Sequence, residues 1–207
     1  MRILLGAVLV TVLAPIAAAT TLVIDADPYA AGTDISTAFA GVTLSSVGSY
    51  SGLDGHVYAR TAIDPNYPTT GTNVFGNNLS GTDGDGSPMN EVWFPDFRLK
   101  AVFENLANEV SIDAISNDID AYDYGTLEAY DSGGNLLASV TTPALPKYAS
   151  YKLEITRPSF DIAYVIAGGA YGDTLYLDNL RATVVPEPAT LALLGVGGLA
   201  MIRRKRS

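Results

Sequence analysis

The chain has 207 residues, no cysteine, one histidine and a formal net charge of −10. Setting aside the two end segments (1–19 and 186–207) leaves 7 basic and 21 acidic residues, so the middle of the chain carries a formal charge of −14. This charge excludes nucleic acid as a partner, because phosphates need a basic surface. The lack of cysteine excludes disulfides, thiolate catalysis and cysteine-based zinc sites.

The N-terminus has the three parts of a secretory signal peptide. A short basic region precedes an apolar segment (3–13), and the small residues Ala17 and Ala19 form a signal-peptidase site. We therefore expect export through the inner membrane and cleavage after Ala19, which makes residues 1–19 the signal peptide. The alternative is an uncleaved N-terminal anchor, which the proline and alanines before the site disfavour.

The last residues, 185–207, form a second signal with three parts. They are the motif Pro186, Glu187 and Pro188, an apolar segment (189–202), and the basic residues Arg203, Arg204, Lys205 and Arg206. A helix over the apolar segment would be about 21 Å long, short of the roughly 30 Å hydrocarbon core, but local thinning of the bilayer accommodates short spans. We expect a short transmembrane helix, with the basic residues as a cytoplasmic membrane stop.

This order of motif, apolar segment and basic cluster resembles the PEP-CTERM sorting signal of Gram-negative bacteria. The resemblance implies that an exosortase, a membrane cysteine transpeptidase that acts near Pro-Glu-Pro, sorts and processes the protein. It also implies a transient inner-membrane anchor, and then the cell surface or extracellular matrix, in association with exopolysaccharide and biofilm.

Between the two signals, residues 20–184 contain short alternating segments separated by turn residues. One helical turn is predicted at 34–41, a loop at 64–90, and a hairpin turn at 131–135, because capping residues, Gly, Pro, Asn and Asp gather there. Strands are predicted, in chain order, at 21–25, 42–47, 91–94, 97–103, 110–114, 126–130, 136–140, 151–155, 160–167 and 174–184. The series indicates one all-β domain, an antiparallel β-sandwich for which a jelly roll is favoured.

Short phrases of this body resemble jelly-roll passenger domains that accompany such sorting signals. They are Ile24-Asp25, Ala40–Leu44, Ala129–Asn135 and Leu177–Leu180. The resemblance implies a fold like that of carbohydrate-binding modules, in which a structural calcium often joins the first and last strands.

The positions that match this calcium site are Asp25, Asp27 and Asp178, whose carboxylates are the hard oxygen ligands that calcium prefers. The alternative is that Asp178 ends a strand and accepts hydrogen bonds from a loop. A second, weaker acidic cluster is Asp118, Asp120 and Asp123. The acidic segment beginning at Asp83 is not an EF-hand, because the required Gly and Glu positions hold other residues.

Tyrosine is abundant, with 12 residues, whereas tryptophan occurs once. Sugar rings stack on aromatic faces, so Tyr122, Tyr124 and Tyr130 are candidate glycan-binding residues, together with Tyr148 and Tyr151. The alternative is that these tyrosines are half-buried strand residues. Trp93, which lies between two apolar residues, is predicted to be part of the core.

No residue pattern predicts catalysis. His56 is the single histidine and lies in a predicted loop, which favours a solvated side chain. Acidic residues are too numerous for a glycosidase pair to be selected. We therefore expect a non-catalytic exported surface or matrix protein. The alternatives are a lectin-like module that binds polysaccharide, with a structural calcium, and a secreted glycoside hydrolase.

Overall fold

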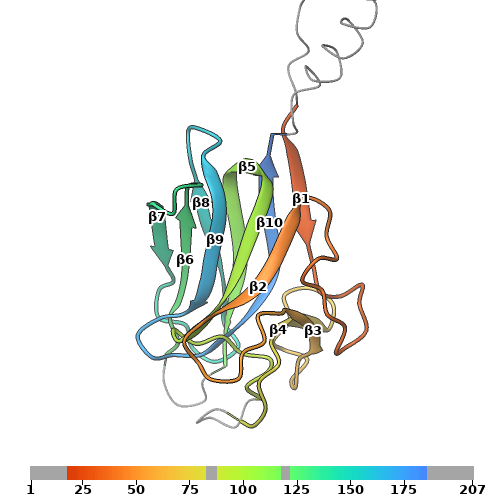
Figure 1. Cartoon of the computed structure of the whole chain (residues 1–207). Helices are drawn as coiled ribbons and strands as arrows, with labels where there is room; N and C mark the ends of the chain where they lie inside the picture. Colours follow the sequence, from red (N-terminus) through yellow and green to blue (C-terminus); the bar gives the residue numbers. More distant parts are fainter. Residues whose placement is uncertain (1–17, 83–87, 118–121, 186–207) are drawn as a thin grey trace, which may run out of the picture. The chain divides into compact units, whose positions relative to one another are not determined.

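The computed structural model describes residues 18–82, 88–117 and 122–185 (Figure 1). The signal-peptide residue Ala17, the acidic residues Asp118 and Asp120, and the whole sorting signal from Pro186 to Arg206 therefore lie outside the described residues. Residues Ala19–Val185 form one compact unit. Among the described residues, no helix is long and apolar enough to cross a membrane.

Ten antiparallel strands make up the described body. They are β1 (Thr20–Ile24), β2 (Val42–Gly48), β3 (Tyr58–Thr61), β4 (Asn73–Gly76), β5 (Phe97–Ser116), β6 (Gly125–Tyr130), β7 (Leu136–Thr141), β8 (Ser150–Thr156), β9 (Ile162–Gly169) and β10 (Leu175–Val184). The predicted all-β class and antiparallel sandwich are confirmed, while the jelly-roll assignment stays a prediction.

Strand β5 belongs to both layers of the sandwich. Its first half pairs with β2 and β9, so one layer has the order β2-β5-β9-β6-β7. Its second half pairs with β8 and β10, and β10 pairs in turn with β1 and β4. The ladder with β9 is interrupted between Val102 and Ala107, where β5 folds over one end of the sandwich (Figure 1).

The core lies between the two layers because alternate strand residues point inward. In β5, Val110, Ile112 and Ala114 are buried, and from β10, Leu180 and Ala182 join the same core cluster. Trp93 is fully buried, as predicted, and its indole nitrogen donates to the carbonyl of Phe75 at 2.8 Å. The buried indole therefore keeps its hydrogen bond, which avoids a desolvation cost of about 1–3 kcal/mol.

Four local predictions were wrong. Residues 34–41 form turns and one isolated bridge rather than a helical turn, and residues 91–94 contribute only isolated bridges. The predicted loop 64–90 contains β4, which is buried at all four residues and therefore lacks the alternation that marks a half-buried strand. The two strands predicted at 97–103 and 110–114 are one continuous, bent strand.

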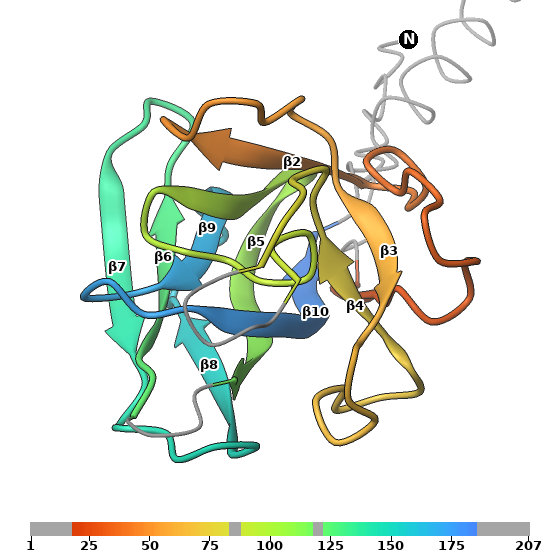
Figure 2. The same ribbon diagram turned by 90° about the horizontal axis from the view of Figure 1, so that it is seen from below.

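The two ends of the sandwich differ. One end, here called the tail end, carries the bend of β5, the β6–β7 turn, and the paired residues Thr20 and Val184 (Figure 1). The opposite end, called the loop end, carries the connections β2–β3, β4–β5, β5–β6, β7–β8 and β9–β10 (Figure 2). At about 3.3 Å per residue, the ten residues of β10 place the two ends roughly 33 Å apart.

Strand β7 is the edge of its layer, and its register shows which backbone groups face outward. The amide of Thr142 donates to the carbonyl of Gly125, and the carbonyl of Val140 accepts from Thr126 Oγ1. Since these groups alternate along a strand, the amides of Val140 and Ala138 face β6, and the amide of Ser139 faces away from it.

This register makes a prediction for proline substitutions. Ser139→Pro should change the free energy of unfolding by less than about 1 kcal/mol, because the lost amide is outside the ladder. Val140→Pro should lower it by roughly 3 kcal/mol, because it removes a ladder hydrogen bond. Urea unfolding of both variants checks the register, and equal losses would contradict it.

Candidate functional site at the loop end

The exposed tyrosines gather at the loop end. Among the described large hydrophobic residues, the exposed tyrosines are Tyr50, Tyr122, Tyr148, Tyr151 and Tyr171. Four of them lie on connections at this end, and Tyr151 is the second residue of β8, which starts there. The site thus comes from four connections that are far apart in the sequence and that the two layers bring to one end (Figure 2).

Two of these tyrosines have an unfavourable backbone conformation. Tyr148 has φ 63° and Tyr171 has φ 57°, in the left-handed region. This region costs a residue with a side chain roughly 1–2 kcal/mol, and glycine would avoid the cost. Tyr171 is also 83% exposed, so burial of its ring does not offset the cost. Backbone strain at an exposed aromatic residue is a reason to look for function there.

Tyr171 and Tyr124 form an aromatic pair. Their ring centroids are 5.6 Å apart in an edge-to-face arrangement. The backbone holds the two segments together, because the amide of Ala170 donates to the carbonyl of Tyr124 at 2.8 Å and Asp173 accepts from the amide of Tyr124. Tyr122, two residues earlier, is 58% exposed. The pair and its neighbour present aromatic surface to solvent.

An aromatic pocket of about 190 Å³ opens elsewhere at this end. Its walls are the side chains of Tyr50, Met89, Phe94, Asp96 and Phe97. Tyr50 packs edge-on against Phe97 with centroids 5.3 Å apart, and Phe94 lies 5.0 Å from Phe97. Apolar walls with a single carboxylate suit a ring-shaped ligand that also donates hydrogen bonds.

The predicted glycan-binding residues do not all meet here. Tyr122 and Tyr124 precede β6 at the loop end, whereas Tyr130 ends β6 about 20 Å away. Tyr130 stacks on Tyr164, and its hydroxyl donates to Glu128 at 2.7 Å. Burial and this hydrogen bond raise the pKa of Tyr130 to about 12. Sequence reasoning missed Tyr50 and Tyr171, because only the topology shows which connections share an end.

The predicted calcium ligands bind a loop. Asp178 is fully buried, and its Oδ2 accepts from the amides of Thr69 and Thr70 at 2.8 and 3.0 Å. The Thr70 hydroxyl lies 3.3 Å from Asp25 Oδ2, so Asp25 and Asp178 meet at one residue. Burial raises the pKa of Asp178, although the hydrogen bonds from Thr69 and Thr70 oppose this.

Asp27 holds the next residues of the same loop. Its Oδ1 accepts from the amides of Thr72 and Asn73 at 2.7 and 2.8 Å. Asp27 and Asp178 thus accept backbone amide hydrogens of this loop, and the calcium site stays a prediction. In the part of the chain that the structure describes, no group of three or more acidic or histidine side chains is placed to hold a metal.

The alternative reading of Asp178 as a loop acceptor matches this geometry. Of the second acidic cluster only Asp123 is described, and it is buried, with its Oδ2 accepting from the amide of Asn117 at 2.8 Å.

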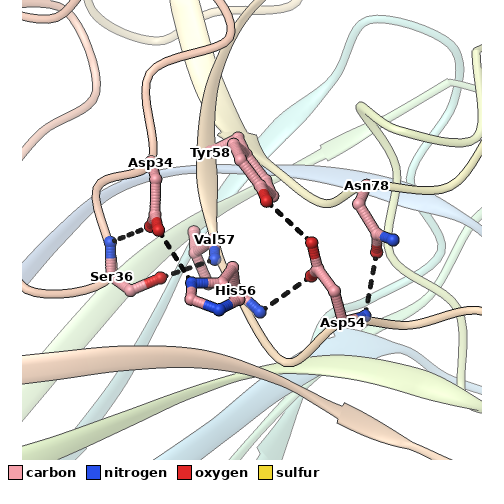
Figure 3. A network of polar contacts seen from close by, with 7 residues as sticks. All are labelled: Asp34, Ser36, Asp54, His56, Val57, Tyr58 and Asn78. Carbon is pink, nitrogen blue, oxygen red and sulfur yellow. Dashed lines mark hydrogen bonds and ion pairs between the residues drawn. The ribbon is translucent and has the colours of Figure 1, made fainter.

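His56 lies in a network of polar contacts that joins three connections (Figure 3). Its Nδ1 is 2.7 Å from Asp34 Oδ2, and its backbone amide donates to Asp54. Burial alone would raise the pKa of Asp34, but hydrogen bonds from Ser36 and His56 hold that pKa below its usual value. Asp54 also accepts from the Tyr58 hydroxyl, and this bond raises the pKa of Tyr58 to about 12.

The network is suited to fastening loops. The Ser36 hydroxyl accepts from the amide of Val57 at 2.9 Å, so it is used as a backbone cap. Since nucleophilic catalysis needs a hydroxyl or thiol within reach of the imidazole, the hydrogen bonds drawn here do not form a catalytic triad. The His56 side chain is 52% exposed, in agreement with the prediction of a solvated loop histidine.

Comparisons with known proteins identify the sorting signal. Residues 184–206 match the family described as the PEP-CTERM protein-sorting motif. The motif implies an exported, exosortase-processed protein associated with the cell surface. No curated protein is significantly similar to the chain in sequence.

The body is similar in structure to adhesin and carbohydrate-binding domains. The K2 cleaved adhesin domain of Lys-gingipain has 13% identity and a TM-score of 0.47, over 80% of this chain and 100% of that one. TmCBM61, solved in complex with beta-1,4-galactotriose, has 15% identity and a TM-score of 0.44, over 68% and 88%. The CBM22-1 xylan-binding domain from Paenibacillus barcinonensis Xyn10C has 12% identity and a TM-score of 0.41, over 84% and 99%. Likenesses at this level say nothing of a ligand for this chain.

The carboxylate contacts predict the effect of substituting a glycine in the 69–73 loop. A Cβ on Gly71 would lie 2.1 Å from Asp27 Oδ2, whereas a Cβ on Gly55 would meet nothing within 4 Å, and both glycines have positive φ. Gly55→Ala should therefore cost only backbone strain, roughly 1–2 kcal/mol. Gly71→Ala should cost about 2 kcal/mol more, because Asp27 must release its amide donors.

Urea unfolding of the two variants measures the difference. Losses of equal size would show that Asp27 does not hold this loop.

Proposed function

We propose that this protein is a non-catalytic surface or matrix protein, delivered by its sorting signal, whose loop end binds polysaccharide. The observation that carries the proposal is the placement of the exposed tyrosines. They lie at the end of the sandwich opposite Val184, where the sorting motif begins. A body that is held or transferred through its C-terminus thereby keeps its aromatic surface free.

Tyrosine is suited to this task. Its ring gives a large, rigid face for stacking on a sugar, and its hydroxyl adds a hydrogen bond, at low cost in conformational entropy. The aromatic pair of Tyr124 and Tyr171 and the pocket beside Tyr50 offer two such faces. The acidic charge of the body keeps it soluble in an extracellular matrix.

The carboxylate geometry favours binding over hydrolysis. Glycosidases need two carboxyl groups on either side of an open cleft. The Thr69 hydroxyl lies between Asp113 and Asp178, and the Thr70 hydroxyl lies between Asp25 and Asp178, so the covering loop separates these carboxylates from an open cleft. Asp178 is fully buried, so a glycosidic bond does not reach it. This supports a non-catalytic protein over a secreted hydrolase.

A glycan-binding experiment tests the loop end. The body from Thr20 to Val185 should bind polysaccharide extracted from the host, and paired Tyr122→Ala and Tyr171→Ala substitutions should lower the affinity about tenfold, because each lost stacking contact contributes roughly 0.5–1.5 kcal/mol. Leu136→Ala is the matched control, since Leu136 is an exposed apolar residue at the tail end. Unchanged affinity in the double variant, measured by calorimetry, would rule out this surface.

The processing step has its own test. In the host, the mature protein should lack residues 189–207, which mass spectrometry of the surface fraction detects. Replacing Pro186, Glu187 and Pro188 together with alanine should leave the uncut chain in the inner membrane, because the motif marks the site of processing. An uncut wild-type tail at the surface would make this a plain membrane protein.

A further inference from the structure

A polar hollow of about 240 Å³ lies on the outer face of the layer that contains β10, and no tyrosine lines it. Strand β5 contributes Glu109 and Ser111, and β10 contributes Arg181 and Thr183. The remaining lining residues are Thr21 of β1, Lys152 of β8, and Ala182. Four neighbouring strands therefore build this hollow.

The strand registers explain how these side chains meet. Arg181 lies opposite Ser111, and Thr183 lies opposite both Glu109 and Thr21. Residues that alternate with these, such as Val110, point into the core. The rigid ladder thus fixes the spacing of the polar groups, and Ser111 is only 4% exposed.

Arg181 is unusual among the basic residues of this acidic body. Arg98 and Arg157 form ion pairs with Glu128 and Asp161, at 2.9 and 2.7 Å. The guanidinium of Arg181 forms no ion pair with any residue in the described parts of the chain. Its Nε donates to Asn179 Oδ1 at 3.1 Å, and its two terminal nitrogens make no hydrogen bond with the described residues.

The other basic residues outside the hollow are also engaged. Arg60 donates to the carbonyl of Asn77, and the ammonium groups of Lys100 and Lys147 lie over tyrosine rings. Within the hollow, Lys152 is paired with Glu154 at 2.5 Å. Arg181, by contrast, has neither an ion pair nor a ring contact with the described residues, and only its Nε is hydrogen-bonded.

We propose that the hollow binds a carboxylate-bearing sugar, a uronate unit of an acidic polysaccharide. The planar fork of Arg181 matches a carboxylate with two parallel hydrogen bonds. The ligand's hydroxyl groups pair with Thr21, Ser111 and Thr183, and Glu109 accepts from them. A phosphate polymer suits this lining less. Its repeating unit has no hydroxyl group that could donate a hydrogen bond to Glu109.

The net charge of the body does not prevent this binding. At 0.1 M salt the Debye length is about 10 Å, so carboxylates far from the hollow are screened while Arg181 acts at contact distance. Binding should weaken at lower salt, where the repulsion by the whole body reaches further. This hollow is independent of the tyrosines at the loop end, so either proposal can fail without the other.

Calorimetry with a galacturonate oligosaccharide and the matching neutral galactose oligosaccharide, at 0.1 M salt, tests the proposal. The body from Thr20 to Val185 should prefer the uronate. Arg181→Gln should lower its affinity for the uronate tenfold or more, since a charge-assisted pair is lost. Arg181→Lys should lower the affinity for the uronate less than Arg181→Gln does. Lysine keeps the positive charge, although it lacks the planar guanidinium that forms two parallel hydrogen bonds with a carboxylate.

The matched control is Lys100→Gln, which removes one positive charge from the other layer, over Tyr164. It should leave uronate binding unchanged. Equal affinities of the wild type and Arg181→Gln would overturn the proposal, as would equal binding of the uronate and the neutral oligosaccharide. Tighter binding of a sulfated oligosaccharide than of the uronate would also overturn it, by assigning the hollow to another anion.

Discussion

The backbone pairing of β5 is the constraint on which the rest of the structure depends. Because one strand pairs with four others, β2 and β9 along its first half and β8 and β10 along its second, the two layers cannot slide independently. The bend between the halves lies at one end of the sandwich, and the connections β2–β3, β4–β5, β5–β6, β7–β8 and β9–β10 lie at the other end. Strand β5 thus fixes which connections share the tyrosine-bearing end, and it contributes Glu109 and Ser111 to the polar hollow.

The sequence predicts much of this fold, and the failures have physical causes. The alternation of apolar and polar residues predicted the strands in the second half of the chain. One example is the segment in which Val110, Ile112 and Ala114 point inward. It did not show that β5 is continuous, because the polar residues Glu104 and Asn105 at the bend interrupt the pattern. Strands β3 and β4 are four residues long, too short for periodicity to separate them from loops.

The candidate site was predicted less completely than the fold. Proximity of Asp25 to Asp178 was anticipated from the first and last strands, and β1 does pair with β10. The loop that covers these carboxylates could not be foreseen, since Thr69 lies 109 positions from Asp178 in the chain. The abundance of tyrosine suggested Tyr122 and Tyr124 as binding residues. Tyr130 is separated from them because β6 runs from the loop end to the tail end, which the sequence does not show.

The pairing of β1 with β10 also bears on the order of events during export. Strand β10 is the last strand of the body, yet it lies between β1 and the second half of β5. The second layer is therefore incomplete until residues 175–184 have crossed the membrane, immediately before the sorting motif at 184–206 arrives. Closure of the sandwich and recognition by the exosortase are thus separated by only a few residues of translocation. A chain arrested earlier leaves an open sheet edge on the outer side of the membrane.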